Sequence, residues 1–211
     1  MLGIIGPNGA GKTTFLNAVV GLLAPTSGTV SILGKSWQDA RGLFAYIPQK
    51  NSIDWDFPAT VFDMVLMGCY GKLGWFARPK KEDRARAYEA IATVGLEHVA
   101  HYSIGVLSGG QRQRVFVARA LMQDAQVYFL DEPFAGVDSK TESSIISLFK
   151  KLRDQGKTII VVHHDLHTAP LYFDWALLLN KRCVAIGPVG DVLTQQYLNC
   201  VYSKNLFVPG L

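Results

Sequence analysis

Residues 2–14 read LGIIGPNGAGKTT, an apolar run followed by a glycine-rich turn and a helical pattern. The run Leu2–Ile5 predicts a buried strand, and the residues from Lys12 to about Leu22 predict a helix. Every fixed position of the pattern GxxxxGK[ST] is occupied between them. A strand before this pattern and a helix after it are the context in which it binds phosphate.

Phosphate binding explains why these residue types occur together. Glycines let the backbone approach phosphate oxygens without a Cβ in the way, and the N–H groups then point inward at the positive end of a helix dipole. Lys12 is a point charge able to reach the β- and γ-phosphates, and the Thr13 hydroxyl is placed to ligate Mg²⁺. The sequence thus predicts a site for ATP and Mg²⁺. Its nucleotide-binding residues are Gly6, Pro7, Asn8, Gly9, Ala10, Gly11, Lys12, Thr13 and Thr14.

A second stretch supplies the acidic half of such a site. Residues 127–132 read VYFLDE, a buried strand that ends in two adjacent carboxylates. We expect Asp131 to hold Mg²⁺ directly or through water, and Glu132 to polarise a water aimed at the γ-phosphate. A base positioned in this way contributes about 10²–10⁴ in rate.

Composition narrows the class of protein. The chain has 211 residues, of which 49% are hydrophobic and 18% charged, enough for one domain with a substantial core and unlike disordered or collagen-like chains. No run approaches the roughly 18–20 apolar residues that span a bilayer. The formal net charge is +4, and the positive charge is concentrated in residues 72–119, which contain nine Lys and Arg but only four Asp and Glu. This segment could meet phosphate, an acidic partner or an anionic membrane, or could be a solvated helix face.

Strand and helix patterns alternate along most of the chain. Such alternation is typical of an α/β fold with a mostly parallel sheet. The expected strands are 29–33, 44–47, 127–130, 158–162, 175–179 and 184–186, and the expected later helices are 111–122, 139–155 and 166–172. Helical patterns at 60–68 and 81–94 interrupt this rhythm. We therefore predict a single domain over 1–211, with an ATPase core in 1–49 and 111–211 and a helical subdomain in 50–110.

The pentapeptide LSGGQ at Leu107–Gln111 is the most specific feature, because it arises by chance at roughly one in a million positions. Together with the phosphate loop it makes the chain resemble the ATPase subunit of an ATP-binding cassette transporter, from Gly3 to about Thr194. The resemblance implies a P-loop NTPase (RecA-like) fold with an inserted helical subdomain. It also implies ATP hydrolysis coupled to transmembrane transport.

The resemblance assigns roles to further residues. Gln49 matches a glutamine that touches Mg²⁺ or the attacking water, and His164 matches a switch histidine at the γ-phosphate, whereas its neighbour His163 stands where the family often has Thr and is predicted to have no role. Asp138 matches an aspartate that crosses a dimer interface. The signature residues implied to contact the γ-phosphate on the other subunit are Ser108, Gly109, Gly110 and Gln111. A head-to-tail homodimer bridged by ATP, with two composite sites, follows from this.

Residues 54–68 and 134–138 resemble the metal-import branch of that family, which serves manganese, zinc or iron. In the alternative reading, Trp55, Phe57 and Phe62 are simply core of the helical subdomain. The branch implies a peripheral ATPase at the cytoplasmic face of the inner membrane, integral membrane permease subunits, an extracytoplasmic metal-binding protein and no nucleic acid. It also implies that the transported ion does not bind this chain, so His163, His164 and His167 are not expected to form a metal site.

Two other functions stay open at this point. One is a soluble cassette ATPase of DNA repair, and the other is a nucleotide-binding regulatory module that does not hydrolyse ATP. The family also carries, upstream of the phosphate loop, antiparallel strands and an aromatic residue that stacks on adenine. These strands are missing here, so we expect a shortened version of a longer subunit, with weak nucleotide affinity and a partly uncovered apolar sheet edge.

Overall fold

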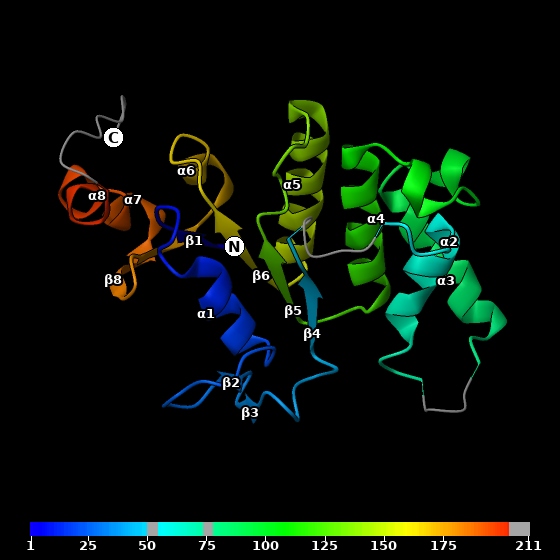
Figure 1. Ribbon diagram of the computed structural model, residues 1–211, viewed down its shortest axis with the longest axis horizontal. Helices are drawn as coiled ribbons and strands as arrows, with labels where there is room; N and C mark the ends of the chain where they lie inside the picture. Colours follow the sequence, from blue (N-terminus) through cyan, green and yellow to red (C-terminus); the bar gives the residue numbers. More distant parts are fainter. Residues whose placement is uncertain (50–54, 74–77, 203–211) are drawn as a thin grey trace.

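The computed structural model describes residues 1–49, 55–73 and 78–202. A six-stranded sheet in the order β4-β5-β6-β1-β7-β8 forms its centre (Figure 1). The first five strands in this order are parallel, and β8 runs antiparallel to β7. The strands are β1 (Leu2–Ile5), β4 (Phe44–Ile47), β5 (Val127–Asp131), β6 (Thr158–His163), β7 (Trp175–Leu179) and β8 (Cys183–Pro188). A separate antiparallel hairpin joins β2 (Ser31–Ile32) and β3 (Lys35–Ser36). The prediction of a mostly parallel α/β sheet is confirmed.

Helices cover both faces of this sheet. The α-helices are α1 (Lys12–Val19), α2 (Val61–Leu66), α3 (Lys81–Thr93), α4 (Gly109–Met122), α5 (Ser139–Asp154), α6 (Ala169–Tyr172), α7 (Val189–Val192) and α8 (Gln195–Val201). Short 3-10 turns lie at η2 (Met67–Cys69), η3 (Glu97–Val99) and η4 (Ile104–Val106).

Neighbouring side chains along each strand point to opposite faces of the sheet, so the core has two layers. Ile4 and Phe129 belong to a cluster that packs under Leu16 of α1. Their neighbours Ile5 and Leu130 belong to a larger cluster that continues into the helices on the other side. Successive side chains of a strand point to opposite faces, so strands that are apolar throughout bury both faces of the sheet.

The helices α2, α3 and α4 pack together beside the sheet, next to β4 and α5 (Figure 1). Among them α4 contacts α2, α3, β4 and α5, and so it joins the helical group to the sheet. The predicted boundary between the helical subdomain and the ATPase core, at residue 110, therefore falls in the first turn of α4. This helix packs against both parts. The division into core and subdomain remains a prediction.

The carboxyl ends of the parallel strands meet at one edge of the sheet. The register pairs Ile5 of β1 with His163 of β6, and Asp131 of β5 with Val162 of β6. The segments that leave these strands therefore start side by side. This edge brings together the phosphate loop, the acidic pair and the two histidines.

Several predicted boundaries move for local reasons. The helix expected to reach Leu22 ends at Val19, ahead of Gly21, whose φ of 78° is left-handed. The helix expected from Leu166 begins only at Ala169, because the Asp165 carboxylate accepts hydrogen bonds from the His167 N–H and the Thr168 hydroxyl and holds a turn there. The strand β3 and the helices α7 and α8 were not predicted.

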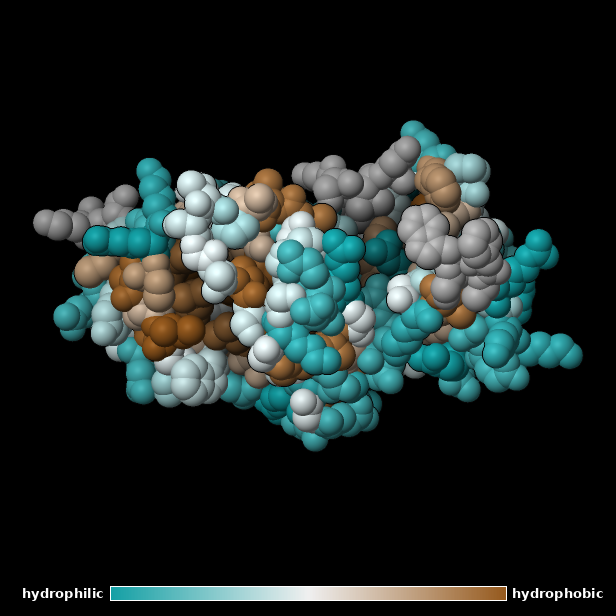
Figure 2. Space-filling model, turned by 90° about the horizontal axis from the view of Figure 1, so that it is seen from below, coloured by the Kyte–Doolittle hydropathy of each residue, from teal (hydrophilic) through white to brown (hydrophobic). Residues whose placement is uncertain are grey.

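An apolar groove of about 350 Å³ lies on the sheet face beside α1. Phe15, Leu33 and Ile186 line it and are 41%, 58% and 60% exposed. Figure 2 shows hydrophobic side chains gathered on this side of the molecule, seen from below.

Candidate functional site

The phosphate loop follows β1 directly and ends where α1 begins. Gly11 is the N-cap of α1 with a φ of 92°, a left-handed conformation that only glycine adopts readily. A Cβ on Gly6 would lie 2.1 Å from the backbone oxygen of Leu179, so glycine is required for the loop to pass the end of β7. The loop and Glu132 line a hollow of about 250 Å³. The structure thus forms a cradle at the N-terminus of a helix, where backbone N–H groups bind anions.

Lys12 is buried within this cradle. Its Nζ donates hydrogen bonds to the backbone oxygens of Gly6, at 2.8 Å, and Pro7, at 3.0 Å. Burial lowers the pKa of Lys12, while the nearby carboxylates of Glu132 and Asp131 act in the opposite direction. The ammonium is therefore held against its own loop, close to two negative charges.

Asp131 has an unsatisfied oxygen beside the cradle. The Thr13 hydroxyl donates to Oδ1 of Asp131 at 3.2 Å, whereas Oδ2 is buried and has no hydrogen-bond partner among the described residues. Burial raises the pKa of Asp131, and the Thr13 hydrogen bond and Lys12 oppose that rise. A buried carboxylate oxygen next to a hydroxyl fits Mg²⁺, which takes one or two carboxylates and completes its shell with phosphate oxygens and water.

Glu132 and Gln49 meet at the same edge of the sheet. Nε2 of Gln49 donates a hydrogen bond of 3.1 Å to Oε2 of Glu132. Glu132 has a φ of 48°, a left-handed conformation that is unusual for this residue type. Such strain persists only where the surroundings enforce it, and it is common at functional sites. The structure therefore brings together Gln49, which the resemblance assigned to the hydrolysis, and Glu132, which was assigned to it from its place after a buried strand.

His163, the last residue of β6, and His164, which follows it, differ sharply in environment. His164 is exposed, and its imidazole makes no hydrogen bond within the part of the chain that the structure describes. His163 is buried, and its Nε2 lies 2.8 Å from the Thr168 hydroxyl oxygen. Burial, followed by the neighbouring His164, lowers the pKa of His163 to about 4. Within the described residues no three His, Cys, Asp or Glu side chains group as they would around a metal ion.

The signature segment caps α4. The Ser108 hydroxyl accepts a hydrogen bond from the Gln111 N–H at 3.3 Å, and Oε1 of Gln111 accepts one from the Ser108 N–H at 2.9 Å. This reciprocal pair is a capping box, so Gln111 fixes Ser108 at the helix start. The S-x-x-Q spacing carried that signal in the sequence, and the helix predicted over 111–122 begins at Gly109.

Asp138 lies beside the signature segment. A Cβ on Gly110 would be 3.5 Å from Oδ2 of Asp138. Asp138 caps α5 by accepting hydrogen bonds from the N–H and hydroxyl of Thr141, and these bonds lower its pKa. The predicted residues thus fall into two groups. One surrounds the cradle, and the other, at the starts of α4 and α5, has no hydrogen bond to the cradle among the described residues.

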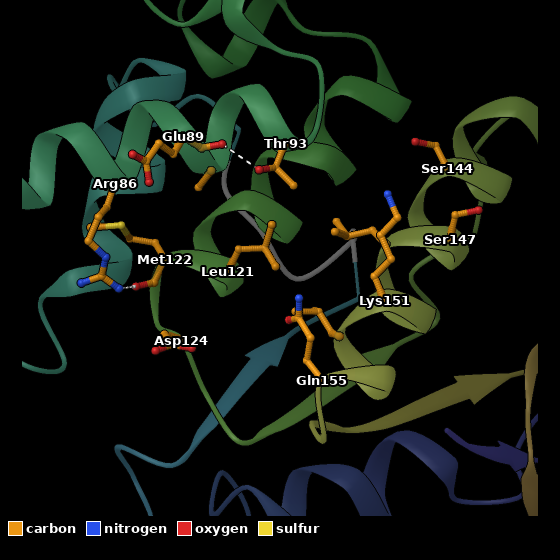
Figure 3. Close-up of a pocket in the computed structure, with 13 residues that line it drawn as sticks. Arg86, Glu89, Thr93, Leu121, Met122, Asp124, Ser144, Ser147, Lys151 and Gln155 are labelled. Atoms are coloured by element: carbon orange, nitrogen blue, oxygen red, sulfur yellow. Dashed lines mark hydrogen bonds between the residues drawn. The ribbon is translucent and has the colours of Figure 1, made fainter.

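A larger hollow, of about 800 Å³, lies between α3, α4 and α5 (Figure 3). Two of its polar side chains are bonded to nearby backbone: an Arg86 Nη donates to the backbone oxygen of Met122, and the Thr93 hydroxyl donates to that of Glu89. None of its lining residues belongs to either group of predicted site residues. It is a groove between the helical group and α5, and it shares no lining residue with the hollow at the phosphate loop.

Comparisons with known proteins show which family this chain resembles. A family model described as "ABC transporter" matches residues 1–135. The zinc transport system ATP-binding protein TroB of Treponema pallidum is 54% identical, covering 98% of this chain and 79% of that protein. The manganese transport system ATP-binding protein MntB of Bacillus subtilis is 52% identical, covering 98% of this chain and 82% of that protein.

Two solved structures share the fold. A metal-chelate type ABC transporter in an inward-facing conformation has a TM-score of 0.84 at 30% identity, covering 95% of this chain and 77% of that one. The ATP-binding cassette MJ0796, dimeric and bound to ADP and Pi after hydrolysis, has a TM-score of 0.78 at 29% identity, covering 90% of this chain and 85% of that one.

Proposed function

The chain belongs to the ABC transporter family, and from that premise we propose that it is the ATP-hydrolysing subunit of an importer for a divalent metal ion. The observation that carries the hydrolytic part is the convergence of Lys12, Thr13 and Glu132 on one hollow at the start of α1. The transport part is supported by relatives named for zinc and manganese transport. Those names give no support to a role in DNA repair.

The cradle binds and orients the triphosphate. Backbone N–H groups of the loop from Asn8 to Thr14 and the Lys12 ammonium hold the β- and γ-phosphates. Thr13 and Asp131 would hold Mg²⁺, and Gln49 would contact the ion or the attacking water. When bound, Mg²⁺ neutralises charge that develops on the phosphate oxygens. These residues contribute positioning and electrostatic stabilisation, which are the main sources of catalysis in phosphoryl transfer.

Glu132 acts on the attacking water. Its carboxylate accepts a water proton as the water oxygen approaches the γ-phosphorus, and the bond from that phosphorus to the bridging oxygen of ADP breaks. The Gln49 amide, which already donates to Oε2 of Glu132, leaves the other carboxylate oxygen for that water. His164 completes the site as a donor to the γ-phosphate.

A second copy of the chain completes the site. Ser108, Gly109, Gly110 and Gln111 present a helix start whose N–H groups bind anions, but in one chain they have no hydrogen bond to the cradle within the described residues. In a head-to-tail dimer each signature segment would contact the γ-phosphate in the other copy's cradle, with Asp138 at the interface. Two-fold symmetry then forms two equivalent sites.

The membrane partners follow from the same proposal. The subunit works at the cytoplasmic face of the membrane, bound to integral permease subunits that receive the ion from an extracytoplasmic metal-binding protein. No helix in the described residues is long and apolar enough to cross a bilayer. The ion passes through the permease, and no metal-binding role is proposed for the histidines here.

The test combines hydrolysis, assembly and uptake. Glu132→Gln is expected to bind MgATP, to lose phosphate release by about 10²-fold or more, and to accumulate as a dimer in light scattering. Glu97→Gln, an exposed carboxylate on η3, is the matched control and should behave as the wild type. Cells that carry Glu132→Gln should also lose uptake of radioactive Mn²⁺ or Zn²⁺. Phosphate release by Glu132→Gln at the wild-type rate would overturn the hydrolytic role of Glu132, and unchanged uptake of both ions would overturn metal import.

A further inference from the structure

His163 is a buried polar residue that the proposed hydrolysis does not use. It is 4% exposed, although it lies one position before the exposed His164. Its ring packs against three aromatic rings, with centroid separations of 5.9 Å to Phe134, 5.8 Å to Tyr172 and 5.4 Å to Phe173. These contacts fix the plane of the imidazole, so its hydrogen bond has a defined direction.

That hydrogen bond runs into the turn after His164. Nε2 of His163 lies 2.8 Å from the Thr168 hydroxyl oxygen, and the same hydroxyl donates to Oδ2 of Asp165 at 3.0 Å. Because the hydroxyl has one proton and gives it to the carboxylate, its bond to His163 requires a proton on Nε2. With a pKa of about 4, the ring is neutral at neutral pH and donates through Nε2. The two hydrogen bonds that link His163, Thr168 and Asp165 thus span the segment that carries His164.

The same ring contacts the turn that carries Glu132. Phe134 follows Glu132 by two positions, and the Ala135 N–H donates to the backbone oxygen of Glu132 at 3.2 Å, which closes that turn. The ring of His163 therefore packs on one turn and is hydrogen-bonded to the next. Glu132 and His164 are each held by a segment that His163 contacts.

We propose that His163 is a positioning residue that sets His164 relative to Glu132 by tying the 165–168 turn to the Glu132 turn. The prediction from the resemblance, that His163 has no role, is replaced by this one. The inference rests on the proposed function, because it assumes that His164 and Glu132 act on the same γ-phosphate. His163 itself touches no substrate.

If His163 is purely structural, its variants should differ in kcat from those expected if it positions His164. His163→Phe keeps a ring in the aromatic cluster but removes the donor, whereas His163→Gln keeps an N–H donor near the position of Nε2. Misplacing a reacting group by about 1 Å costs up to about 10²-fold in rate. We expect His163→Phe to lower kcat about 10-fold or more with KM for ATP unchanged, and His163→Gln to restore kcat to within about 3-fold of the wild type.

Thr168→Val tests the same hydrogen bond from its other end and covers the case in which His163→Phe does not fold. It should reproduce the loss in kcat, and in a double-mutant cycle the pair His163→Phe/Thr168→Val should be no slower than either single variant. Additive losses would overturn the proposal, as would a wild-type kcat in Thr168→Val or a rise in KM that accounts for the whole effect.

A readout independent of turnover separates this inference from the proposed function. The Cε1–H resonance of His164 in ¹³C-labelled protein should be single and narrow in the wild type and His163→Gln, and shifted or broadened in Thr168→Val. If Glu132→Gln hydrolyses ATP normally while the His164 resonance responds as expected, the proposed function fails and the positioning of His164 stands. If Glu132→Gln is inactive and the His164 resonance is the same in all variants, the positioning role alone fails.

Discussion

Glu132 combines an unfavourable backbone conformation with the most demanding chemical task in the site. A left-handed conformation costs a residue with a Cβ roughly 1–2 kcal/mol. Proteins keep such strain where it aims a functional group, and here it directs the carboxylate to Gln49 and the cradle. Stability and activity therefore oppose each other at this position.

Replacing Glu132 by glycine should separate these two quantities. We expect Glu132→Gly to be more stable than Glu132→Ala by about 1 kcal/mol, because only glycine adopts this φ without strain. Both variants should lose ATP hydrolysis. Urea unfolding without nucleotide measures the difference, and equal free energies of unfolding would show that the conformation is not strained.

His163 makes stability depend on pH in a predictable direction. Its pKa is lowered from 6.5 to about 4, so the unfolded chain binds a proton in this range that the folded chain does not. Stability is therefore lost as the pH falls from about 6.5 toward 4, and this residue alone accounts for about 2 kcal/mol between pH 7 and pH 5.

The check is the difference between the wild type and His163→Gln in urea unfolding at pH 7 and pH 5. Other groups contribute equally to both proteins, including Asp131, whose raised pKa acts in the opposite direction. The wild type should lose about 2 kcal/mol more than the variant on acidification. Parallel losses would mean that the buried imidazole binds its proton as readily as a free one.

The start of α4 serves stability and assembly through one side chain. Ser108→Ala removes the cap and should cost about 1 kcal/mol of the free energy of unfolding. Ser108→Asp keeps a good capping oxygen but places a negative charge where the partner copy's γ-phosphate is expected. It should remain as stable as the wild type and yet form no dimer with MgATP, as urea unfolding and light scattering would show. Dimer formation by Ser108→Asp would contradict the assigned role of this helix start.

The individual elements show how far a sequence can be interpreted without its structure. The strands Phe44–Ile47 and Trp175–Leu179 have the predicted bounds, because short apolar runs between turn signals leave few alternatives. The helix at Ala169 starts late because the carboxylate of Asp165 bonds the backbone and hydroxyl that follow it. Helices as short as Val189–Val192 have too few turns to show a period. Local hydrogen bonds of this kind were not visible in the hydrophobic pattern.

The candidate site was predictable to the extent that it depends on contiguous motifs. The strand, the glycine-rich turn, the lysine and the helix all lie within residues 2–19, so the cradle and its ligand class could be predicted from the sequence alone. The bond between Gln49 and Glu132 joins residues 83 positions apart, and only the register of β4 and β5 brings them together. The burial of His163 depends likewise on Phe134 and Phe173, which no local pattern connects to it.

Across the whole molecule, the two groups of site residues predict complementation between damaged copies. Lys12→Ala and Ser108→Asp, each combined with Glu132→Gln to block hydrolysis, should not dimerise alone with MgATP. A mixture should form dimers, because a head-to-tail pair then holds one site built from an intact cradle and an intact signature segment. Sedimentation velocity measures this outcome. A mixture that stays monomeric would mean that one intact site is too weak to hold two copies.

The two hydrogen bonds from the Lys12 ammonium to the carbonyls of Gly6 and Pro7 have a consequence for the kinetics of nucleotide capture. A lysine has a long and mobile side chain, and immobilising it costs conformational entropy. Here that entropy is lost when the chain folds and not when the nucleotide binds. An arriving triphosphate therefore exchanges partners with a group that is already in place instead of waiting for one to be recruited. The rate of capture should then be governed by diffusion and charge attraction rather than by rearrangement of the receiving loop.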